Sequence, residues 1–523
     1  MKTKYIFIFF ILIGLTACQN DDDGNIVAEP VELTAGSADF SRYVSVGNSL
    51  SAGYMDNALF RAGQELSFPN LLAQRFSLVG GGAFTQPLMN DNVGGLLFNG
   101  VPNPAFGPRL FINPATTEIS QVNALPTTEV FAPSAAPYNN LAVPGAKSFH
   151  LLFDGYGNPV NLAPPSPTAN PYFVRMASAP NTTVLGDAMS QSPTFFSLWI
   201  GNNDVLGYAT SGGDGSNPIT PSAGPPGIGF DQTFAAIIAT LTSGGAQGVV
   251  ANIPDVTALP FFTAVPHDPL DPTNPAFGPQ ISTLNGAYAP LNAAFDFLGM
   301  PDRKVVFSET EASPIVIHDE SLPNIGVQLA QVLQGGGLDP ITSQILAAQY
   351  GQSRQATADD LIVLLASTAI ATLNQDYFNQ LVFLGVPPAT AGQLAVNGVT
   401  YPMEDKWVLL PSEQLEVKSA TEGFNAVIAS AAQGAGLALV DANSFLNELA
   451  GSGVSFGDFT LTSDLVLGGA FSLDGVHPNS RGYSVGANAF LRAIDATYGS
   501  NFEASGNFYN PGDFPTNYPE SLQ

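Results

Sequence analysis

The sequence contains very little cysteine and very little charge. Its 523 residues include one cysteine, so an internal disulfide is excluded and stability has to come from an ordinary hydrophobic core. Only 11% of the residues are charged, and 15 Lys and Arg stand against 43 Asp and Glu. The resulting net charge of -28 excludes the basic surface with which proteins bind phosphate backbones. We therefore expect no nucleic-acid partner.

The sequence also lacks the usual patterns of metal and nucleotide sites. No group of His, Cys and carboxylate residues has the spacing of zinc ligands, and no Gly-rich loop carries the lysine that binds phosphate. No metal or other cofactor is predicted. Of the four histidines, His150, His267 and His318 have no setting comparable to that of the fourth and are expected to be structural or at the surface.

Long apolar runs are confined to the N-terminus. Residues 5–15 follow a basic start and form an apolar stretch that is too short to span a bilayer, which takes roughly 20 residues. The segment Leu15-Thr16-Ala17-Cys18 resembles the lipobox of bacterial lipoprotein signal peptides. This resemblance implies that residues 1–17 are removed and that Cys18 carries a lipid anchor to a membrane. The alternative is an ordinary signal peptide with an incidental cysteine.

An acidic run, Asp21-Asp22-Asp23, opens a polar stretch at 18–38 that we expect to be a flexible tether. The run also resembles the surface-export signals of lipoproteins in the Bacteroidetes. The acidic run is compatible with both a solvated tether and an export signal. Either one predicts an outer-membrane lipoprotein, and the second adds exposure at the cell surface.

Strand and helix patterns alternate along the rest of the chain. Buried strands are predicted at 42–46, 194–200, 248–254 and 436–441, and helices at 68–76, 234–241, 423–432 and 482–498. This alternation predicts an α/β fold: a three-layer α/β/α sandwich with a parallel sheet.

Two long segments interrupt this pattern. We expect a domain at 39–500 with insertions at about 77–137 and 258–418, followed by a C-terminal tail at 501–523. The second insertion has a helical interlude between Ile341 and Leu384. We expect it to form a cap over the site, since it leaves the carboxyl end of a strand, although a separate domain is the alternative. Its Pro260-Phe261-Phe262 run favours an apolar acyl pocket.

Two short motifs near the ends of the domain carry side chains suited to nucleophilic catalysis. Ser49 follows a predicted strand in a glycine-bounded turn, Gly47-Asn48-Ser49. Asp474 and His477 lie in one short loop before the last helix, so that the carboxylate can orient the imidazole and the imidazole can activate a serine. Ser49, Asp474 and His477 are therefore the predicted catalytic triad.

Together these motifs resemble the SGNH or GDSL family of serine hydrolases, a lipase and esterase family of flavodoxin-like fold. Ser49, Gly145, Asn203 and the Asp474–His477 pair match its sequence blocks in chain order. The resemblance implies an oxyanion hole made by the backbone amides of Ser49 and Gly145 and the side chain of Asn203. One position departs from the family, because Asn48 stands where an acidic residue is usual.

The predicted function is hydrolysis of carboxylic esters through an acyl-enzyme intermediate. The substrate class is open between lipid-like esters and the acetyl esters of carbohydrates. A different class of function, a non-catalytic surface protein that binds a glycan or a protein partner on the same fold, is the third alternative.

Overall fold

The computed structural model describes residues 31–116, 118–132, 137–456 and 459–523. Contacts divide the chain after Glu32, and the unit described below is Leu33–Gln523. The predicted signal peptide, Cys18 and most of the tether lie outside the described residues. No helix in the described ranges is both long enough and apolar enough to cross a membrane.

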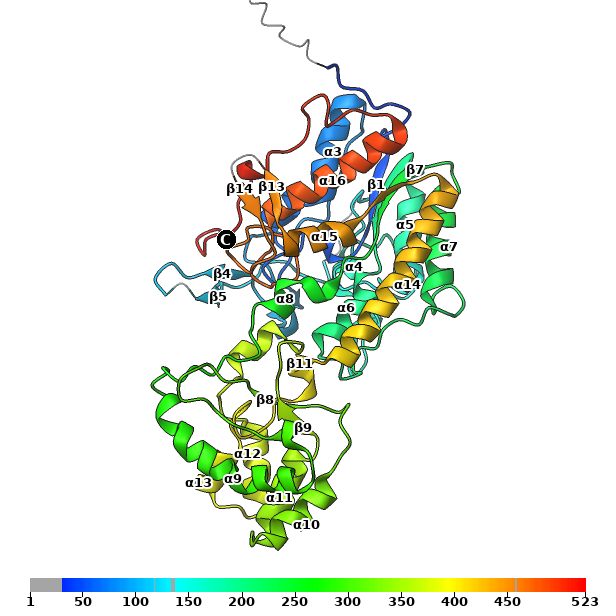
Figure 1. Ribbon diagram of the computed structural model, residues 1–523. Coiled ribbons are helices and arrows are strands. Elements are labelled where there is room, and N and C mark those ends of the chain that lie inside the picture. The colour runs from blue at the N-terminus through cyan, green and yellow to red at the C-terminus, as the bar shows by residue number, and fades with distance from the viewer. Residues whose placement is uncertain (1–30, 117, 133–136, 457–458) are drawn as a thin grey trace, which may run out of the picture. The chain divides into compact units, whose positions relative to one another are not determined.

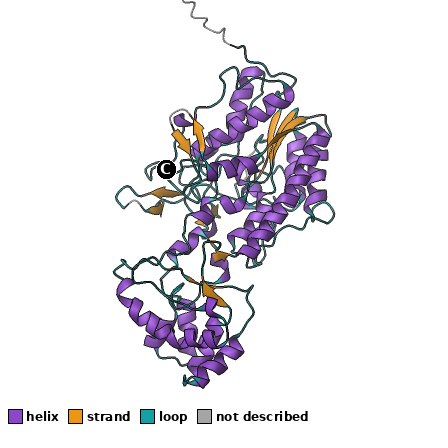
Figure 2. Cartoon of the chain, in the orientation of Figure 1, coloured by secondary structure: helices purple, strands orange, loops and turns teal. Residues whose placement is uncertain are grey.

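A parallel sheet of four strands organises the fold (Figures 1 and 2). The strands lie in the order β1-β6-β7-β12, and all three pairings are parallel. Their bounds are Tyr43–Gly47 for β1, Phe195–Trp199 for β6, Gln247–Ala251 for β7 and Ala438–Val440 for β12. The four predicted strands are thus confirmed within a few residues, and so is the α/β class with a parallel sheet.

Side chains alternate between the two faces of this sheet and enter two separate cores. Tyr43, Phe195 and Val249 pack with the helices α3 and α16, whereas Val44 and Phe196 pack with α5, α7 and α14. Figure 1 shows these two sets of helices on opposite sides of the strands. Both faces are buried, which explains why these strands are mainly apolar in sequence.

The predicted helices are present, and one is longer than expected. The helices beside the sheet are α3 (Phe68–Phe76), α5 (Val184–Ser190), α7 (Phe230–Thr242), α14 (Pro411–Ala435) and α16 (Ser480–Tyr498). Helix α14 begins before Lys418, the expected end of the second insertion. Pro411 occupies its first turn, and the carboxylate of Glu413 accepts the backbone N–H of Leu410 at 2.7 Å. These two start signals place the end of the insertion near residue 410.

The connections between the sheet strands and the two insertions contain further helices and short strands. The remaining helices are α1 (Ser49–Ala52), α2 (Arg61–Glu65), α4 (Pro171–Met176), α6 (Asn202–Thr210), α8 (Pro260–Thr263), α9 (Ile281–Phe297), α10 (Gly326–Gly335), α11 (Pro340–Tyr350), α12 (Gln375–Phe383), α13 (Pro388–Leu394) and α15 (Ala442–Gly451). The remaining strands form antiparallel pairs: β2 (Leu97–Phe98) with β3 (Val101–Pro102), β4 (Leu110–Ile112) with β5 (Ile119–Gln121), β8 (Val316–His318) with β9 (Ser353–Gln355), β10 (Leu361–Ile362) with β11 (Val408–Leu409), and β13 (Val454–Phe456) with β14 (Phe459–Leu461). The helical interlude predicted at 341–384 is therefore two helices, α11 and α12, separated by short strands.

Both ends of the domain are tied to its body. The N–H of Thr34 donates to Asn501 Oδ1 at 2.8 Å, and that of Ser37 donates to the Tyr498 carbonyl at 2.8 Å, so packing starts a few residues before the expected boundary at 39. In the C-terminal segment, the carbonyls of Tyr518, Pro519 and Leu522 accept hydrogen bonds from the fully buried guanidinium of Arg109. This segment is therefore part of the folded unit.

Candidate active site

Ser49 stands at the carboxyl end of β1, where the chain turns directly into the one-turn helix α1. Asn48 caps this helix, because its Oδ1 accepts the N–H of Leu50 at 3.0 Å. The cap leaves the N–H of Ser49 at the free end of the helix, where within the described residues it donates to no protein acceptor. Ser49 is 7% exposed. Its hydroxyl and its amide thus sit together at the edge of the sheet where open α/β folds bind ligands.

Asp474 and His477 lie in a tight loop between β14 and α16. One carboxylate oxygen of Asp474, Oδ1, accepts the backbone N–H groups of Val476 and His477, each at 2.9 Å. Gly475, between them, has a φ of 72°, and a side chain there would come within 2.9 Å of the backbone of Phe261. Glycine therefore allows both the left-handed turn and the close approach that bring the acid beside the base.

The predicted triad is assembled in one hydrogen-bonded line. His477 Nε2 lies 2.8 Å from Ser49 Oγ, and His477 Nδ1 lies 2.9 Å from Asp474 Oδ2. With the ring proton on Nδ1, facing the carboxylate, Nε2 is left to accept the serine proton. Burial opposes the charge on Asp474, but the charge and hydrogen bonds of His477 outweigh it and lower the pKa of Asp474 to about 2. The acid therefore stays ionised beside the base.

Of the three expected oxyanion donors, Ser49 and Asn203 lie beside the nucleophile's cavity, whereas Gly145 is not part of the lining that the described residues form. Asn203 Nδ2 donates one hydrogen to the carbonyl of Ala146 at 2.9 Å, which holds the Asn203 side chain beside the turn that contains Gly145. Ser49 and Asn203 both line the cavity next to the nucleophile. Gly145 lies in an exposed turn with a φ of 80° and, in the part of the chain that is described, is not among the residues lining that cavity.

Comparison with protein-family models, curated proteins and solved structures finds no match. The site is therefore interpreted from its own geometry.

Asn202, the residue before Asn203, is a polar group that the sequence did not single out. Its Oδ1 accepts a hydrogen bond from Asn48 Nδ2 at 3.0 Å, whereas its buried Nδ2 has no partner among the described residues. Asn202 also lines the cavity beside Ser49. An unpaired buried amide is costly unless a ligand or water completes it, so Asn202 is a second candidate donor to the substrate.

A second feature that the sequence analysis did not predict is a turn that is hydrogen-bonded to the loop containing Asp474 and His477. Asp56 and Asn57 both have positive φ values, 52° and 61°, in a tight turn between Met55 and Ala58. The N–H of Asn57 donates to Asp474 Oδ2 at 3.0 Å, and Asp56 Oδ1 accepts the N–H of Leu473 at 3.1 Å. Asp and Asn adopt this left-handed conformation more readily than other residues with a side chain, which suits both of them to this turn. Its backbone donor carries no side-chain signature that a sequence could reveal.

The buried carboxyl of Asp56 is hydrogen-bonded to the backbone of Leu473, the residue before Asp474. Burial and the charge of Asp474 raise the pKa of Asp56 to about 7, against the opposing effects of the Leu473 N–H and of Arg109. The pKa of Asp474 is about 2, so Asp474 loses its proton well before Asp56 as the pH rises. This separation keeps the negative charge on the group that contacts His477.

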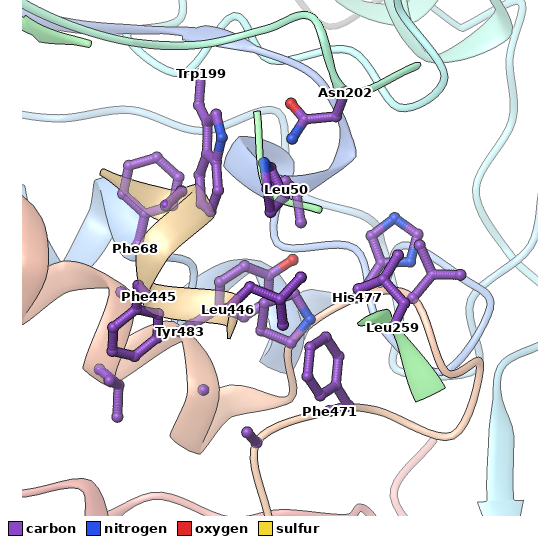
Figure 3. Close-up of a pocket in the computed structure, with 18 of the residues that line it drawn as sticks. Leu50, Phe68, Trp199, Asn202, Leu259, Phe445, Leu446, Phe471, His477 and Tyr483 are labelled. Atoms are coloured by element: carbon purple, nitrogen blue, oxygen red, sulfur yellow. The ribbon is translucent and has the colours of Figure 1, made fainter. Parts of the chain in front are cut away.

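A mainly apolar cavity opens beside Ser49 and His477 (Figure 3). Its volume, taken as the space open to the centre of a water molecule, is about 110 Å³. Figure 3 shows His477 and Leu259 on one side of the view and Phe68 and Trp199 on the other, with Phe445, Leu446 and Phe471 around the same space. Most of this wall comes from α15, α16 and the segment that follows β14.

The prediction that Phe261 and Phe262 form this pocket is wrong. Within the described chain the lining includes Leu259 but no residue from 260 to 418, and both phenylalanine rings are buried in the hydrophobic core instead. The insertion does meet the acid-base loop, since the N–H of Phe261 donates to the carbonyl of Gly475 at 2.9 Å. A cap formed by the rest of the insertion stays a prediction.

The other histidines lie outside the triad. The ring of His150 stacks on Tyr156, its Nδ1 accepts the N–H of Lys147 at 3.0 Å, and burial lowers its pKa to about 4. His267 and His318 belong to the second insertion, where His318 ends strand β8 and His267 lies 3.8 Å from Asp268. These contacts fit the structural roles expected for them.

One acidic cluster brings three carboxylates together away from the triad. Oxygen atoms of Glu320, Asp405 and Glu413 all lie within 4.8 Å of one another, which is close enough to share a cation. Burial and the neighbouring carboxylates raise the pKa of Asp405 to about 6 and that of Glu413 to about 9. Among the residues described, none of the three lines the cavity beside Ser49.

Proposed function

We propose that this protein is a serine hydrolase that cleaves carboxylic esters through an acyl-enzyme intermediate. The observation that carries the proposal is the line of hydrogen bonds from Ser49 Oγ through the ring of His477 to Asp474, with distances of 2.8 and 2.9 Å. This is the geometry that a general base needs to activate a hydroxyl nucleophile.

In the proposed reaction, Ser49 Oγ attacks the acyl carbon while His477 Nε2 takes the hydroxyl proton. The tetrahedral intermediate then collapses, the bond to the alcohol oxygen breaks, and His477 returns the proton to the departing alcohol. Water attacks the resulting Ser49 ester in the same way, which releases the carboxylic acid and restores the serine. Asp474 holds the ring of His477 in place and stabilises its charged form throughout.

The negative charge that develops on the carbonyl oxygen needs fixed donors. The free N–H of Ser49, the second N–H of the Asn203 amide and the N–H of Gly145 are assigned to it, as in the SGNH family that the sequence resembles. Helix α1 is only one turn long, so the donors themselves, and not a helix dipole, are expected to supply most of this stabilisation.

The fold and the location belong to the same proposal. Helices on both faces of the parallel sheet support a three-layer α/β/α sandwich of the SGNH-hydrolase type. The lipobox-like segment that ends at Cys18 supports an outer-membrane lipoprotein, anchored through its lipid, with an ester as its substrate. No cofactor and no nucleic acid enter the proposed reaction.

Labelling with a fluorophosphonate probe tests the proposal directly. The folded protein should bind one probe, and the modified residue should be Ser49 by peptide mass spectrometry. Ser49→Ala should abolish labelling, and Asp474→Asn should slow it. The exposed Ser452 offers a matched control, since Ser452→Ala should change nothing. A folded protein that resists the probe and hydrolyses no ester would instead favour the non-catalytic binding protein.

A further inference from the structure

The wall of the cavity beside Ser49 is built from carbon over most of its area. Its apolar residues come from elements far apart in the chain, and they are Phe68, Trp199, Leu206, Leu446, Phe471 and Phe490 among others. Phe68 and Phe490 are stacked, with ring centroids 4.4 Å apart, and Trp199 packs on Phe68 at 5.7 Å. The cavity therefore has a rigid aromatic wall of the kind that takes an apolar ligand.

Two polar side chains of this wall, Tyr483 and Trp199, already have partners. The hydroxyl of Tyr483 donates to the carbonyl of Tyr54 at 2.7 Å, and Trp199 Nε1 donates to the carbonyl of Asn252 at 3.1 Å. Asn202 Nδ2, which has no partner among the described residues, belongs to a side chain that is bonded to Asn48 and lines the same cavity as Ser49. A sugar in this cavity would bury hydroxyl groups with few partners, which is costly, whereas an alkyl chain would lose nothing.

We propose that this cavity binds the acyl chain of the substrate, and that the preferred substrates are esters of unbranched fatty acids longer than four carbons. The inference rests on the proposed ester hydrolysis at Ser49. In this arrangement the acyl carbon lies at Ser49 and the chain runs along α15 and α16, away from His477. Acetyl esters, including those of carbohydrates, would leave the cavity empty.

The structure assigns chain-length selection to helix α15. Phe445, Leu446 and Leu449 lie on one face of this helix and line the cavity, and Leu446 is 5% exposed. The spacing of these residues is that of a single helical face. A larger side chain at Leu446 should shorten the space for the acyl chain without touching Ser49 or His477.

The test is a series of p-nitrophenyl esters from acetate through butyrate and octanoate to laurate, with kcat/KM measured below the concentrations at which the esters aggregate. Each methylene group that leaves water for an apolar site is worth about fourfold in kcat/KM. Octanoate has four methylenes more than butyrate, so even partial burial should favour it by at least about tenfold.

The variants are Leu446→Trp, which fills the cavity, and Phe445→Ala, which widens it. Leu446→Trp should lower kcat/KM for octanoate and laurate by at least about tenfold, the worth of two buried methylenes, and leave acetate within about twofold. Phe445→Ala should move the preference toward laurate and keeps the test open if the tryptophan variant does not fold. Leu467→Trp is the matched control, because Leu467 is 91% exposed and does not line the cavity in the described structure.

The outcomes separate the two levels of the proposal. Equal rates on all chain lengths, a preference for acetylated sugars, or equal effects of Leu446→Trp on acetate and octanoate would overturn the acyl-chain site while ester hydrolysis stands. Loss of hydrolysis on every ester, together with no fluorophosphonate labelling of Ser49, would overturn the proposed function itself. A rise in rate with chain length that Leu446→Trp removes and Leu467→Trp does not would support the site.

Discussion

Replacement of Asn203 by alanine is the sharpest perturbation of the proposed oxyanion hole. The Asn203 amide has two hydrogens, and one of them is engaged by the carbonyl of Ala146 at 2.9 Å. The other is free to stabilise the charge of the transition state. Losing such a donor lowers kcat by roughly a hundred- to a thousand-fold, or about 3 to 4 kcal/mol of transition-state free energy. Asn203→Ala should show a loss of this size in kcat, with a smaller change in KM.

The same substitution removes a structural hydrogen bond, so its effect on folding has to be measured separately. The carbonyl of Ala146 loses its donor, and Asn203 is half-buried, which predicts a loss of about 1 kcal/mol in the free energy of unfolding. This is too small to unfold a typical domain. Urea titration followed by circular dichroism gives the free energy of unfolding. Steady-state hydrolysis of a soluble ester gives kcat and KM on the same preparation.

Asn202→Ala is the companion variant, because Asn202 also presents an amide at the cavity. We expect Asn202→Ala to lose less than about tenfold in kcat, because the side-chain donor predicted from the sequence is the neighbouring residue, Asn203. Adding Asn203→Ala to Ser49→Ala should cost little more than Ser49→Ala alone, as expected for groups that act in one transition state. Wild-type turnover in a folded Asn203→Ala protein would refute the assignment. A large loss in Asn202→Ala at the same time would transfer the donor role to Asn202.

Three further predictions concern stability and location. The pKa of Asp474 is lowered from 3.8 to about 2, so about 2 kcal/mol of the free energy of unfolding should be present above pH 4 and lost as the pH falls from 4 toward 2; denaturation curves of the wild type and Asp474→Asn that stay parallel over this range would contradict it. The pKa of Glu413 is raised from 4.5 to about 9, so the free-energy cost of ionising this one group in the folded protein is absent below pH 4.5 and grows as the pH rises toward 9; melting temperatures in EDTA should show a weaker decline over this range for Glu413→Gln. Cys18→Ser should abolish incorporation of a fatty-acid probe and move the protein out of the membrane fraction with its esterase activity intact, and unchanged fractionation would refute the anchor.

The sheet and the triad could be predicted because their signals are local. A strand that is buried on both faces is mainly apolar, and β1, β6 and β7 are each apolar apart from one polar residue. Ser49 lies two residues after the end of β1, whereas Asp474 and His477 lie in the short loop before helix α16, so each motif is marked by its place beside a predicted element. Chemistry that depends on residue type and on the position beside such an element is therefore readable from the chain.

The cavity could not be predicted, because its wall is assembled from long-range contacts. Leu446 on α15 and Phe490 on α16 belong to apolar patterns like those of any core-facing helix, and nothing local marks the space between them as open. Phenylalanine-rich composition near the end of β7 pointed to Phe261 and Phe262 instead. Their rings are 6% and 1% exposed and fill the core, because composition does not distinguish a side chain that lines a void from one that fills it.

Asn48, which stands where the SGNH family usually has an acidic residue, sets the orientation of the Asn202 side-chain amide. Asn48 uses its oxygen to cap α1 and its Nδ2 to donate to Asn202 Oδ1, so each of its two ends has a fixed role. Because a donor faces Asn202 Oδ1, the Nδ2 of Asn202 has to point elsewhere, and it is left unpaired in the wall of the cavity. A carboxylate at this position would offer only acceptors, and Asn202 would satisfy itself by turning Nδ2 toward it. Asparagine at 48 thus keeps the turn around Ser49, adds no charge beside the triad, and leaves Asn202 Nδ2 without a partner among the described residues.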